Sequence, residues 1–344
     1  MRHIEYMIRG SGHLFSRWPG LVVEIHDLGW FTERIVGAYV GQDCKRITRQ
    51  RRAPSWGDGL RKGRRSTERR WPPSPDGVAR MTSGQPTGDE IRFEIVDDHI
   101  AVVTLNRPDK RNAVNVALAN ALDRAVKQVE SDAAIRVAIL ASSLPDIFCA
   151  GADVAEIAAG RARQLSTPDG GFAGFHAAKR AKPWIAAVRG AALGGGCELC
   201  LACDMIVAAE DARFGLPEVK RGLFAAAAGS YRLPRALPRA VAIELIATGG
   251  NLPAARAHHF GMVNRLVPAD DVMAEAVRLA GEIAAAAPLG VRESLKLARL
   301  AYERGEDELR ALSQAATDTV FASEDAREGA AAFFEKRPPR WSGR

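Results

Sequence analysis

The stretch Ala192-Leu193-Gly194-Gly195-Gly196-Cys197-Glu198 is the most informative part of this chain. Consecutive glycines let a backbone approach a ligand closely and adopt angles that are closed to other residues. They follow the apolar, strand-like run 183–188, and the residues after them, 197–203, contain neither glycine nor proline, which favours a helix. The stretch therefore predicts a strand-to-helix turn whose unpaired N–H groups point at a bound group, with Glu198 in the first helical turn.

A second turn of the same kind lies upstream. The segment 146–153 ends the strand-like run 137–141 and opens a helix near Asp153. Two such turns could each aim one N–H group at a single carbonyl oxygen. Glu218, in Phe214-Gly215-Leu216-Pro217-Glu218, follows Glu198 by twenty residues. The chain thus offers backbone donors for an oxyanion and two carboxyl groups for proton transfer.

Each glutamate also has an ordinary structural interpretation. A glutamate in the first turn of a helix often complements the helix dipole at the surface, and Glu218 could pair with Lys220 or Arg221. Against the surface interpretation of Glu198, the apolar residues that follow it indicate a buried helix. We therefore favour the catalytic interpretation of both glutamates.

Other kinds of site find less support in the sequence. The glycine pattern of a dinucleotide site and the Gly-Lys-Ser/Thr ending of a phosphate loop are both missing, and no histidine has a convincing serine or cysteine partner for a hydrolase triad. Cys197, Cys200 and Cys203 have no nearby histidine or fourth cysteine, so we expect packed side chains and no metal site. Five cysteines in a chain of this length do not make a disulfide framework, which favours a reducing cytoplasm.

Taken together, the motifs make the chain resemble the enoyl-CoA hydratase/isomerase, or crotonase, superfamily, and most closely an enoyl-CoA hydratase. The resemblance covers about residues 90 to 340 and rests on pieces that stand in the family's order. These pieces are Leu105-Asn106-Arg107-Pro108, Asn112-Ala113-Val114-Asn115, Cys149-Ala150-Gly151-Ala152-Asp153, the stretch 192–198, Phe214 to Glu218, Arg232-Leu233-Pro234 and Ala332-Phe333-Phe334-Glu335-Lys336-Arg337.

The resemblance implies the roles of four groups. The backbone N–H groups of Ala152 and Gly195 would hold the thioester carbonyl of an acyl-CoA and stabilise the enolate-like oxyanion. Glu218 would donate a proton to the α-carbon, while Glu198 would orient the water and take its proton as hydroxide adds to the β-carbon. Such chemistry needs partly desolvated carboxyls, so that at least one has a raised pKa.

The resemblance also implies a CoA site and an assembly. Family-like positions for contacts to substrate or CoA are Lys110, Arg111, Ala113, Ala150, Asp153, Phe333 and Lys336. Phe333 and Lys336 would reach CoA in a neighbouring subunit of a trimer or a pair of trimers. CoA would enter as part of the substrate, with no separate cofactor. For Lys110 and Arg111, a role as solvated loop charges is about equally plausible.

Composition divides the chain into three regions. Residues 1–80 hold 16 Lys or Arg against 8 Asp or Glu and four of the six tryptophans, so the net charge of +7 belongs to this basic extension. Apolar positions between residues 20 and 40 allow a short strand or helix, and the arginine-rich part from about residue 45 is expected to be largely disordered. Met81 is a candidate start of the functional protein. We expect a catalytic core over 81–270 and a helical region over 271–344.

The expected fold class is α/β, with a crotonase-like ββα spiral core and a C-terminal helical trimerisation region. Within it, the sequence predicts a hairpin of 93–96 and 99–105 about Asp97-Asp98, and a helix over 116–131. Helices are expected near 271–287 and 291–304. No apolar stretch approaches the ~20 residues that a membrane-crossing helix needs.

One departure from the family pattern bears on function. Many hydratases carry Pro-Gly-Ala-Gly-Gly after the second glutamate, whereas this chain has Phe224-Ala225-Ala226-Ala227-Ala228-Gly229-Ser230. Two alternatives to a hydratase therefore stay open. One is an enoyl-CoA isomerase, which needs a single base, and the other is a non-catalytic or RNA-associated protein that uses the basic extension, although nucleic-acid binding by this chain is not the favoured interpretation.

Overall fold

The computed structural model describes residues 6–9, 13–18, 21–25 and 90–344. The chain divides into two compact units, Met1–Pro73 and Ser74–Arg344. In the first unit, β1 (Tyr6–Arg9), β2 (His13–Trp18) and β3 (Leu21–Ile25) form an antiparallel sheet. The strand β3 agrees with the apolar pattern after residue 20. The disorder predicted from about residue 45 and the candidate start Met81 lie outside the described residues.

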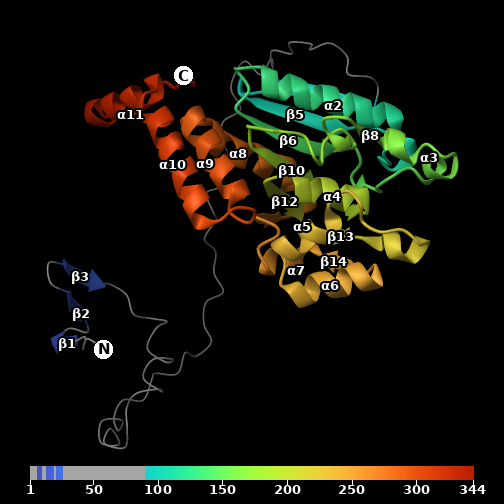
Figure 1. Cartoon of the computed structure of the whole chain (residues 1–344), viewed down its shortest axis with the longest axis horizontal. Coiled ribbons are helices and arrows are strands. Elements are labelled where there is room, and N and C mark those ends of the chain that lie inside the picture. Colours follow the sequence, from blue (N-terminus) through green and yellow to red (C-terminus); the bar gives the residue numbers. More distant parts are fainter. Residues whose placement is uncertain (1–5, 10–12, 19–20, 26–89) are drawn as a thin grey trace, which may run out of the picture. The chain divides into compact units, whose positions relative to one another are not determined.

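The second unit is organised around a six-stranded sheet with the order β15-β12-β10-β6-β5-β4 (Figure 1). All neighbouring pairs are parallel except β4 with β5. The strands are β4 (Ile91–Val96), β5 (Ile100–Leu105), β6 (Val137–Ser142), β10 (Trp184–Val188), β12 (Met205–Ala209) and β15 (Arg265–Val267). The hairpin expected about Asp97-Asp98 is confirmed, and both turn residues have positive φ angles.

A second sheet gives the unit its spiral course. It has the order β14-β13-β11-β7, and three of its short strands follow a strand of the first sheet: β7 follows β6, β11 follows β10, and β13 follows β12. The short strands are β7 (Ile147–Cys149), β11 (Ala191–Leu193), β13 (Arg213–Gly215) and β14 (Asn251–Pro253). A strand in each sheet followed by a helix is the repeating ββα unit that the sequence predicts.

The helices between the strands carry the turns of interest. They are α2 (Val116–Ser131), α3 (Val154–Ala158), α4 (Gly195–Ala202), α5 (Gly229–Ala236), α6 (Arg239–Thr248) and α7 (Ala254–His259). Short 3-10 helices are η2 (Pro108–Lys110), η3 (Ala162–Leu165), η4 (Pro217–Arg221) and η5 (Ala269–Asp271), and β8 (Ser166–Thr167) pairs with β9 (Gly171–Phe172). The predicted helix over 116–131 is observed with those bounds, and the Asn115 side chain caps its first turn.

The short strands modify one expectation about the glycine turns. The sequence places each turn directly after a long apolar strand, but β7 and β11 stand between those strands and the turns. Helix α4 begins at Gly195, inside the glycine run, because Gly194 supplies the cap with φ +55° and ψ −127°. Both turns therefore leave from the second sheet, where β7 and β11 are neighbours.

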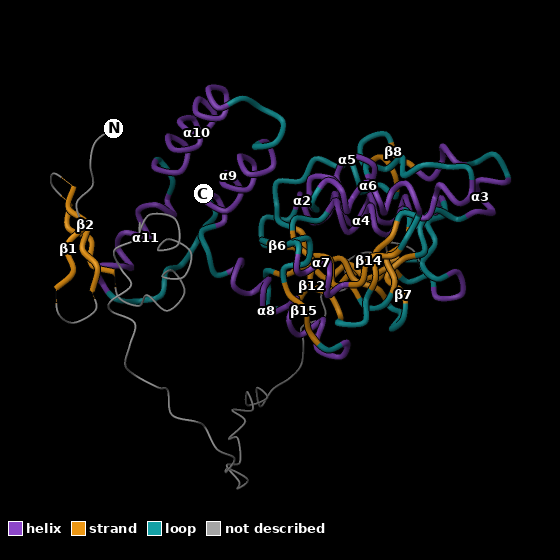
Figure 2. Tube along the Cα trace, turned by 90° about the horizontal axis from the view of Figure 1, so that it is seen from below, coloured by secondary structure: helices purple, strands orange, loops and turns teal. Residues whose placement is uncertain are grey.

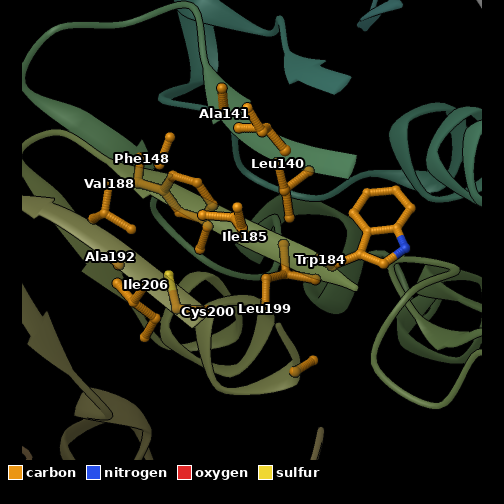
Figure 3. Packing of buried hydrophobic residues seen from close by; sticks show 14 of the residues in the cluster. Leu140, Ala141, Phe148, Trp184, Ile185, Val188, Ala192, Leu199, Cys200 and Ile206 are labelled. Atoms are coloured by element: carbon orange, nitrogen blue, oxygen red, sulfur yellow. The ribbon is translucent and has the colours of Figure 1, made fainter. Parts of the chain in front are cut away.

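The main core lies between the two sheets and their helices. Leu140 of β6, Phe148 of β7 and Ile185 of β10 are fully buried and pack with Leu199 of α4 (Figure 3). Because the hydrophobic effect scales with buried apolar area, this cluster fixes how the turns after β7 and β11 face each other. Trp184, fully buried at the start of β10, packs edge-on against Phe175 with ring centroids 5.0 Å apart.

Four helices end the chain: α8 (Val272–Ala284), α9 (Pro288–Leu300), α10 (Glu306–Phe321) and α11 (Glu324–Glu335). Helix α8 packs on the six-stranded sheet, and α9, α10 and α11 follow as a separate group (Figures 1 and 2). Helix α9 contains no fully buried residue, and α10 contains only Ala316. Within the described part of the chain, no helix is both long enough and apolar enough to cross a membrane.

Candidate active site

The two predicted turns meet at their glycines. A Cβ atom added to Gly151 would lie 3.0 Å from the backbone nitrogen of Gly195 and 2.9 Å from the carbonyl oxygen of Leu193. Gly151 has φ +94°, an angle that residues with a side chain adopt only with strain. One step further on, a Cβ atom on Gly196 would lie 2.2 Å from the Cys149 carbonyl oxygen. Only glycine allows this close approach.

This contact brings the two predicted oxyanion donors to one place. Val114 holds the Ala152 loop with two hydrogen bonds. Its N–H donates to the Gly151 carbonyl (2.8 Å), and its carbonyl accepts from the Asp153 N–H (2.9 Å). Ala152 itself forms only an isolated bridge with Val114, and Gly195 is the first residue of α4. Neither N–H group has a protein acceptor among the described residues, so both are free to bind a ligand oxygen.

Glu198 is a buried carboxyl in the first turn of α4. Its side chain is part of a residue only 3% exposed, and Oε1 accepts a hydrogen bond of 2.8 Å from the Gly229 N–H. Burial raises the pKa of Glu198 to about 7; the Gly229 N–H opposes the shift, and the charge of Glu218 adds to it. A carboxyl with this pKa can accept or release a proton near neutral pH.

Glu218 lies across from it, in η4. Its Oε1 would be 3.1 Å from a Cβ atom on Gly194, so the carboxyl lies over the glycine turn. Its Oε2 is buried and has no hydrogen-bond partner in the described part of the chain. Burial raises the pKa of Glu218, opposed by its own backbone N–H and by the charge of Arg221. The alternative to a catalytic role, pairing with Lys220 or Arg221, is not among the ion pairs of the described residues.

The structure thus brings Glu198, Glu218 and the donors of Ala152 and Gly195 around the same turn. Two carboxyls of raised pKa flank a pair of unengaged N–H groups. Such an arrangement can stabilise a negative oxygen while a proton is delivered at one carbon and removed at a neighbouring one. This constellation defines a class of protein: an acid–base enzyme acting next to a carbonyl group.

Four of the residues predicted for CoA contacts lie beside the Ala152 turn. The Ala150 N–H donates to the Arg111 carbonyl (3.1 Å), and the Arg107 guanidinium donates to the Ala113 carbonyl (2.8 Å) and to Asp153 Oδ2 (2.6 Å). Partial burial alone would raise the pKa of Asp153, but hydrogen bonds from Arg107 and from the Ala155 N–H outweigh it, so the pKa is lowered. Asp153 is therefore an engaged carboxylate that caps α3.

The charged residues predicted for CoA differ in their surroundings. Lys110 and Arg111 are exposed on the loop around η2, near the Ala150 segment. Phe333 and Lys336 stand at the end of α11, which both views place apart from α4 (Figures 1 and 2). Phe333 is 79% exposed. Within one chain, the structure does not bring Phe333 or Lys336 to the two glutamates.

Sequence reasoning missed several residues that shape the site. Asn112 is fully buried and bonds the Arg107 N–H (2.8 Å) and the Phe148 carbonyl (3.0 Å), so it joins the η2 loop to β7. The Phe172 ring lies against Gly195, within 2.5 Å of where a Cβ atom would stand. Gly229 was visible in the sequence only as the one glycine that ends an alanine run, with no signal that its N–H holds Glu198.

The cysteines do not form a second site in the described part of the chain. Cys149, Cys197, Cys200 and Cys203 are all free thiols, and the first three are buried. Burial raises the pKa of Cys149 to about 12. Among the described residues, no group of three or more His, Cys, Asp or Glu side chains could hold a metal ion.

Comparison with known proteins identifies the family of the chain. A family model described as "Enoyl-CoA hydratase/isomerase" matches residues 96–344. A protein of Mycobacterium tuberculosis named "Probable enoyl-CoA hydratase echA8" is 39% identical over 253 residues, which are 72% of this chain and 96% of that protein. "Carnitinyl-CoA dehydratase" of Proteus mirabilis is 38% identical over 247 residues, 70% of this chain and 94% of that protein.

Solved structures give the same result. A crystal structure of enoyl-CoA hydratase from Mycobacterium tuberculosis H37Rv superposes with a TM-score of 0.71 at 43% identity, and covers 75% of this chain and 100% of that one. The chain belongs to the enoyl-CoA hydratase/isomerase family. The resemblance and the fold class that the sequence predicts are confirmed.

Proposed function

We propose that this protein adds water reversibly to a 2-enoyl-CoA and so forms a 3-hydroxyacyl-CoA. The observation that carries the proposal is the pair of carboxyls of raised pKa beside two unengaged backbone N–H groups. Relatives of 39% and 38% identity with hydratase and dehydratase names support the same chemistry.

In the proposed mechanism, the N–H groups of Ala152 and Gly195 bind the thioester oxygen. Glu198 takes a proton from a water molecule as its hydroxide adds to the β-carbon, and negative charge gathers on the thioester oxygen. Glu218 then gives its proton to the α-carbon. Removal of one such oxyanion donor typically costs on the order of 10²–10³ in rate. The two carboxyls exchange roles in the reverse direction, so both pKa values need to lie within reach of neutral pH.

The run Ala225 to Gly229 bears on whether water addition is feasible. Although alanines replace most of the glycines found in many hydratases, Gly229 remains at the position whose N–H bonds Glu198. A Cβ atom at Gly229 would lie 2.9 Å from Glu198 Oε1. Because the contact that orients this carboxyl is kept, we favour hydration over double-bond isomerisation, which needs only one base.

We further propose a trimer or a pair of trimers, in which α9–α11 contact a neighbouring copy. Aromatic side chains on these helices support this assembly, because Phe321, Phe333 and Phe334 are 76%, 79% and 82% exposed. Isolated exposed apolar residues are common, but a row of large ones on helices with few buried residues is typical of an interface. Lys110, Arg111, Ala113, Ala150 and Asp153 would bind the CoA part of the substrate, joined by Phe333 and Lys336 of another copy.

Two smaller proposals complete this picture. We place the protein in the cytoplasm, where the free thiols Cys149, Cys197, Cys200 and Cys203 would stay reduced. We also expect the reaction to need no cofactor other than the CoA that its substrate carries.

The test is a spectrophotometric assay of the full chain with a short 2-enoyl-CoA, following loss of the conjugated thioester absorbance. We expect Glu198→Gln and Glu218→Gln each to lower kcat by about 10²–10⁴, since each removes one proton transfer. Glu244→Gln, at an exposed position in α6, is the matched control and should keep its rate.

Two results would contradict the proposal. The proposed hydratase activity would be rejected if the folded protein added no water to 2-enoyl-CoA substrates of several acyl lengths. Movement of the double bond in a 3-enoyl-CoA that depends on one glutamate alone would favour the isomerase instead. A trimer is checked separately by sedimentation of the same preparation.

A further inference from the structure

A large cleft lies outside the predicted active site. Its volume is about 1140 Å³. Its lining includes neither of the two glutamates, Glu198 and Glu218, and neither of the proposed oxyanion donors, Ala152 and Gly195. The walls come from the segment 176–181, the end of α4, helix α5 and helix α9. Sites for small molecules commonly have volumes of roughly 300–1,000 Å³, so the space is sufficient for one.

The cleft carries an excess of positive charge. Its lining includes seven Lys or Arg side chains and four Asp or Glu side chains. Three of the acids are paired with cations of the same cleft: Asp204 with Arg299 (2.8 Å), Glu293 with Lys296 (3.2 Å), and Glu303 with Arg235 (3.4 Å). The fourth, Glu130, accepts the Ala181 N–H at 2.7 Å.

Four cations of the cleft are left without a carboxylate. In the described part of the chain, Lys179, Arg180, Arg232 and Arg292 form no ion pair. They come from three different elements, the segment 176–181, α5 and α9. Because like charges repel across a shared space of low dielectric, a cluster of this kind is stabilised by an anion between its members.

Arg180 and Arg232 show most clearly that hydrogen-bond acceptors are lacking in the cleft. Arg180 donates to the Ala202 carbonyl (2.5 Å) and its guanidinium lies 4.0 Å from the centre of the Phe175 ring, but its Nε and Nη1 are buried and have no partner among the described residues. Arg232 donates to the His176 carbonyl (2.8 Å), and its Nη1 is likewise buried and unpartnered. Stacking on Phe175 accounts for the position of Arg180, whose charge is attracted by Asp204 but forms no ion pair with it in the described part of the chain.

We propose that this cleft binds a small polyanion, a molecule that carries two or more phosphate or carboxylate groups. The planar guanidinium matches the oxygens of both groups, and the spread of the unpaired cations over three elements requires more than one negative group. None of the proposed catalytic groups lines the cleft, although Arg232 is close enough to Glu198 for its charge to oppose the raised pKa of that carboxyl; binding of an anion does not depend on the proposed hydration. Arg180, Arg232 and Arg292 would contact the anion.

The test is calorimetric titration of the full chain with inorganic pyrophosphate, and in parallel with citrate, at fixed low ionic strength. We expect saturable binding whose Kd rises at least about tenfold in Arg180→Gln and in Arg292→Gln, the size of effect that loss of one charge-assisted contact produces. Arg310→Gln removes the same charge from an exposed position of α10 and should leave the Kd within about twofold. Preference for pyrophosphate or for citrate would tell a phosphate ligand from a carboxylate ligand.

Thermal unfolding gives a second measurement, which does not require the Arg180 variant to fold. Pyrophosphate should raise the Tm of the wild type and of Arg310→Gln equally, and raise that of Arg292→Gln by less at the same concentration. No binding of either anion would overturn the proposal, as would equal binding by Arg292→Gln. It would also be overturned if the anions bound only after dissociation of an oligomer, because a second copy of the chain would then fill the cleft.

Discussion

The turns after β7 and β11 and the helices α9–α11 are built on opposite principles. In the first region, Gly151, Gly195 and Gly196 let two backbones touch, and nearly every neighbouring side chain is buried. In the second, α9 has no fully buried residue and the largest aromatic side chains face outwards. One region is complete within a single chain. The other leaves large aromatic side chains exposed, and the proposed trimer would cover them.

A glycine-to-alanine substitution in each region tests this comparison, which would fail if both changed the free energy of unfolding equally. Gly196→Ala places a methyl group 2.2 Å from the carbonyl oxygen and 2.8 Å from the Cβ atom of Cys149, a buried residue of β7 that cannot move away without shifting the strand. We expect a loss of about 3 kcal/mol or more in the free energy of unfolding, or failure to fold. Gly290→Ala in α9 meets no atom closer than 3.9 Å and removes a glycine from a helix, so it should stabilise by up to about 1 kcal/mol. Denaturant unfolding of both variants measures the contrast.

The buried carboxyl of the first region makes stability depend on pH. The folded-state pKa of Glu198 is about 7 against an ordinary value of 4.5, so the folded chain binds the extra proton between these values. Its stabilising contribution is therefore present below pH 4.5 and is lost as pH rises through 7, by roughly 3 kcal/mol in total. Glu198→Gln should flatten the fall in unfolding free energy from pH 5 to 8. An unchanged slope in that variant would show that Glu198 is not the group responsible.

A smaller effect, on catalysis, is expected at Gly229, which lies outside the two turns and holds the Glu198 carboxyl. Gly229→Ala puts a methyl group 2.9 Å from Glu198 Oε1 and from the Ala225 Cβ atom, and so displaces the carboxyl from its N–H donor. Loss of that hydrogen bond should raise the pKa of Glu198 further and lower kcat by about tenfold, with little change in KM. The acid limb of the pH–rate profile should move to higher pH. Gly281→Ala in α8 meets no atom within 4 Å and, like Gly229, has no positive φ angle, so it controls for the loss of a helical glycine alone.

The smallest effect on stability belongs to the second region. Phe334→Ser removes a side chain that is 82% exposed, so the free energy of unfolding of a single chain should change by no more than about 0.5 kcal/mol. Its sedimentation coefficient should nevertheless fall if α11 contacts another copy. A variant that sediments as the wild type does would remove α11 from the interface. Lys127→Ser, on the exposed side of α2, controls for a surface change elsewhere.

Much of the fold and of the site can be predicted from local sequence. The sequence predicts the helix over 116–131 with its observed bounds, because its apolar residues recur at helical spacing, and the structure adds the Asn115 cap. The hairpin about Asp97-Asp98 follows from two apolar runs joined by residues that tolerate positive φ angles. Glu198 and Glu218, with Ala152 and Gly195, can be proposed from the sequence because each belongs to a short motif. The short strands β7 and β11 escaped notice, since three residues carry too little periodicity.

By itself, the sequence determined which residues are available for chemistry, where glycine permits close backbone contact, and which segments form helices, because these properties depend on neighbours along the chain. Only the tertiary structure decided that Gly229, 31 residues from Glu198, holds its carboxyl, that Phe172 covers Gly195, and that Glu218 lies over Gly194. The raised pKa of Glu198 is likewise a tertiary property, because it arises from exclusion of water by packed strands and helices. Packing between distant segments sets burial, and burial sets the acidity on which the proposed reaction depends.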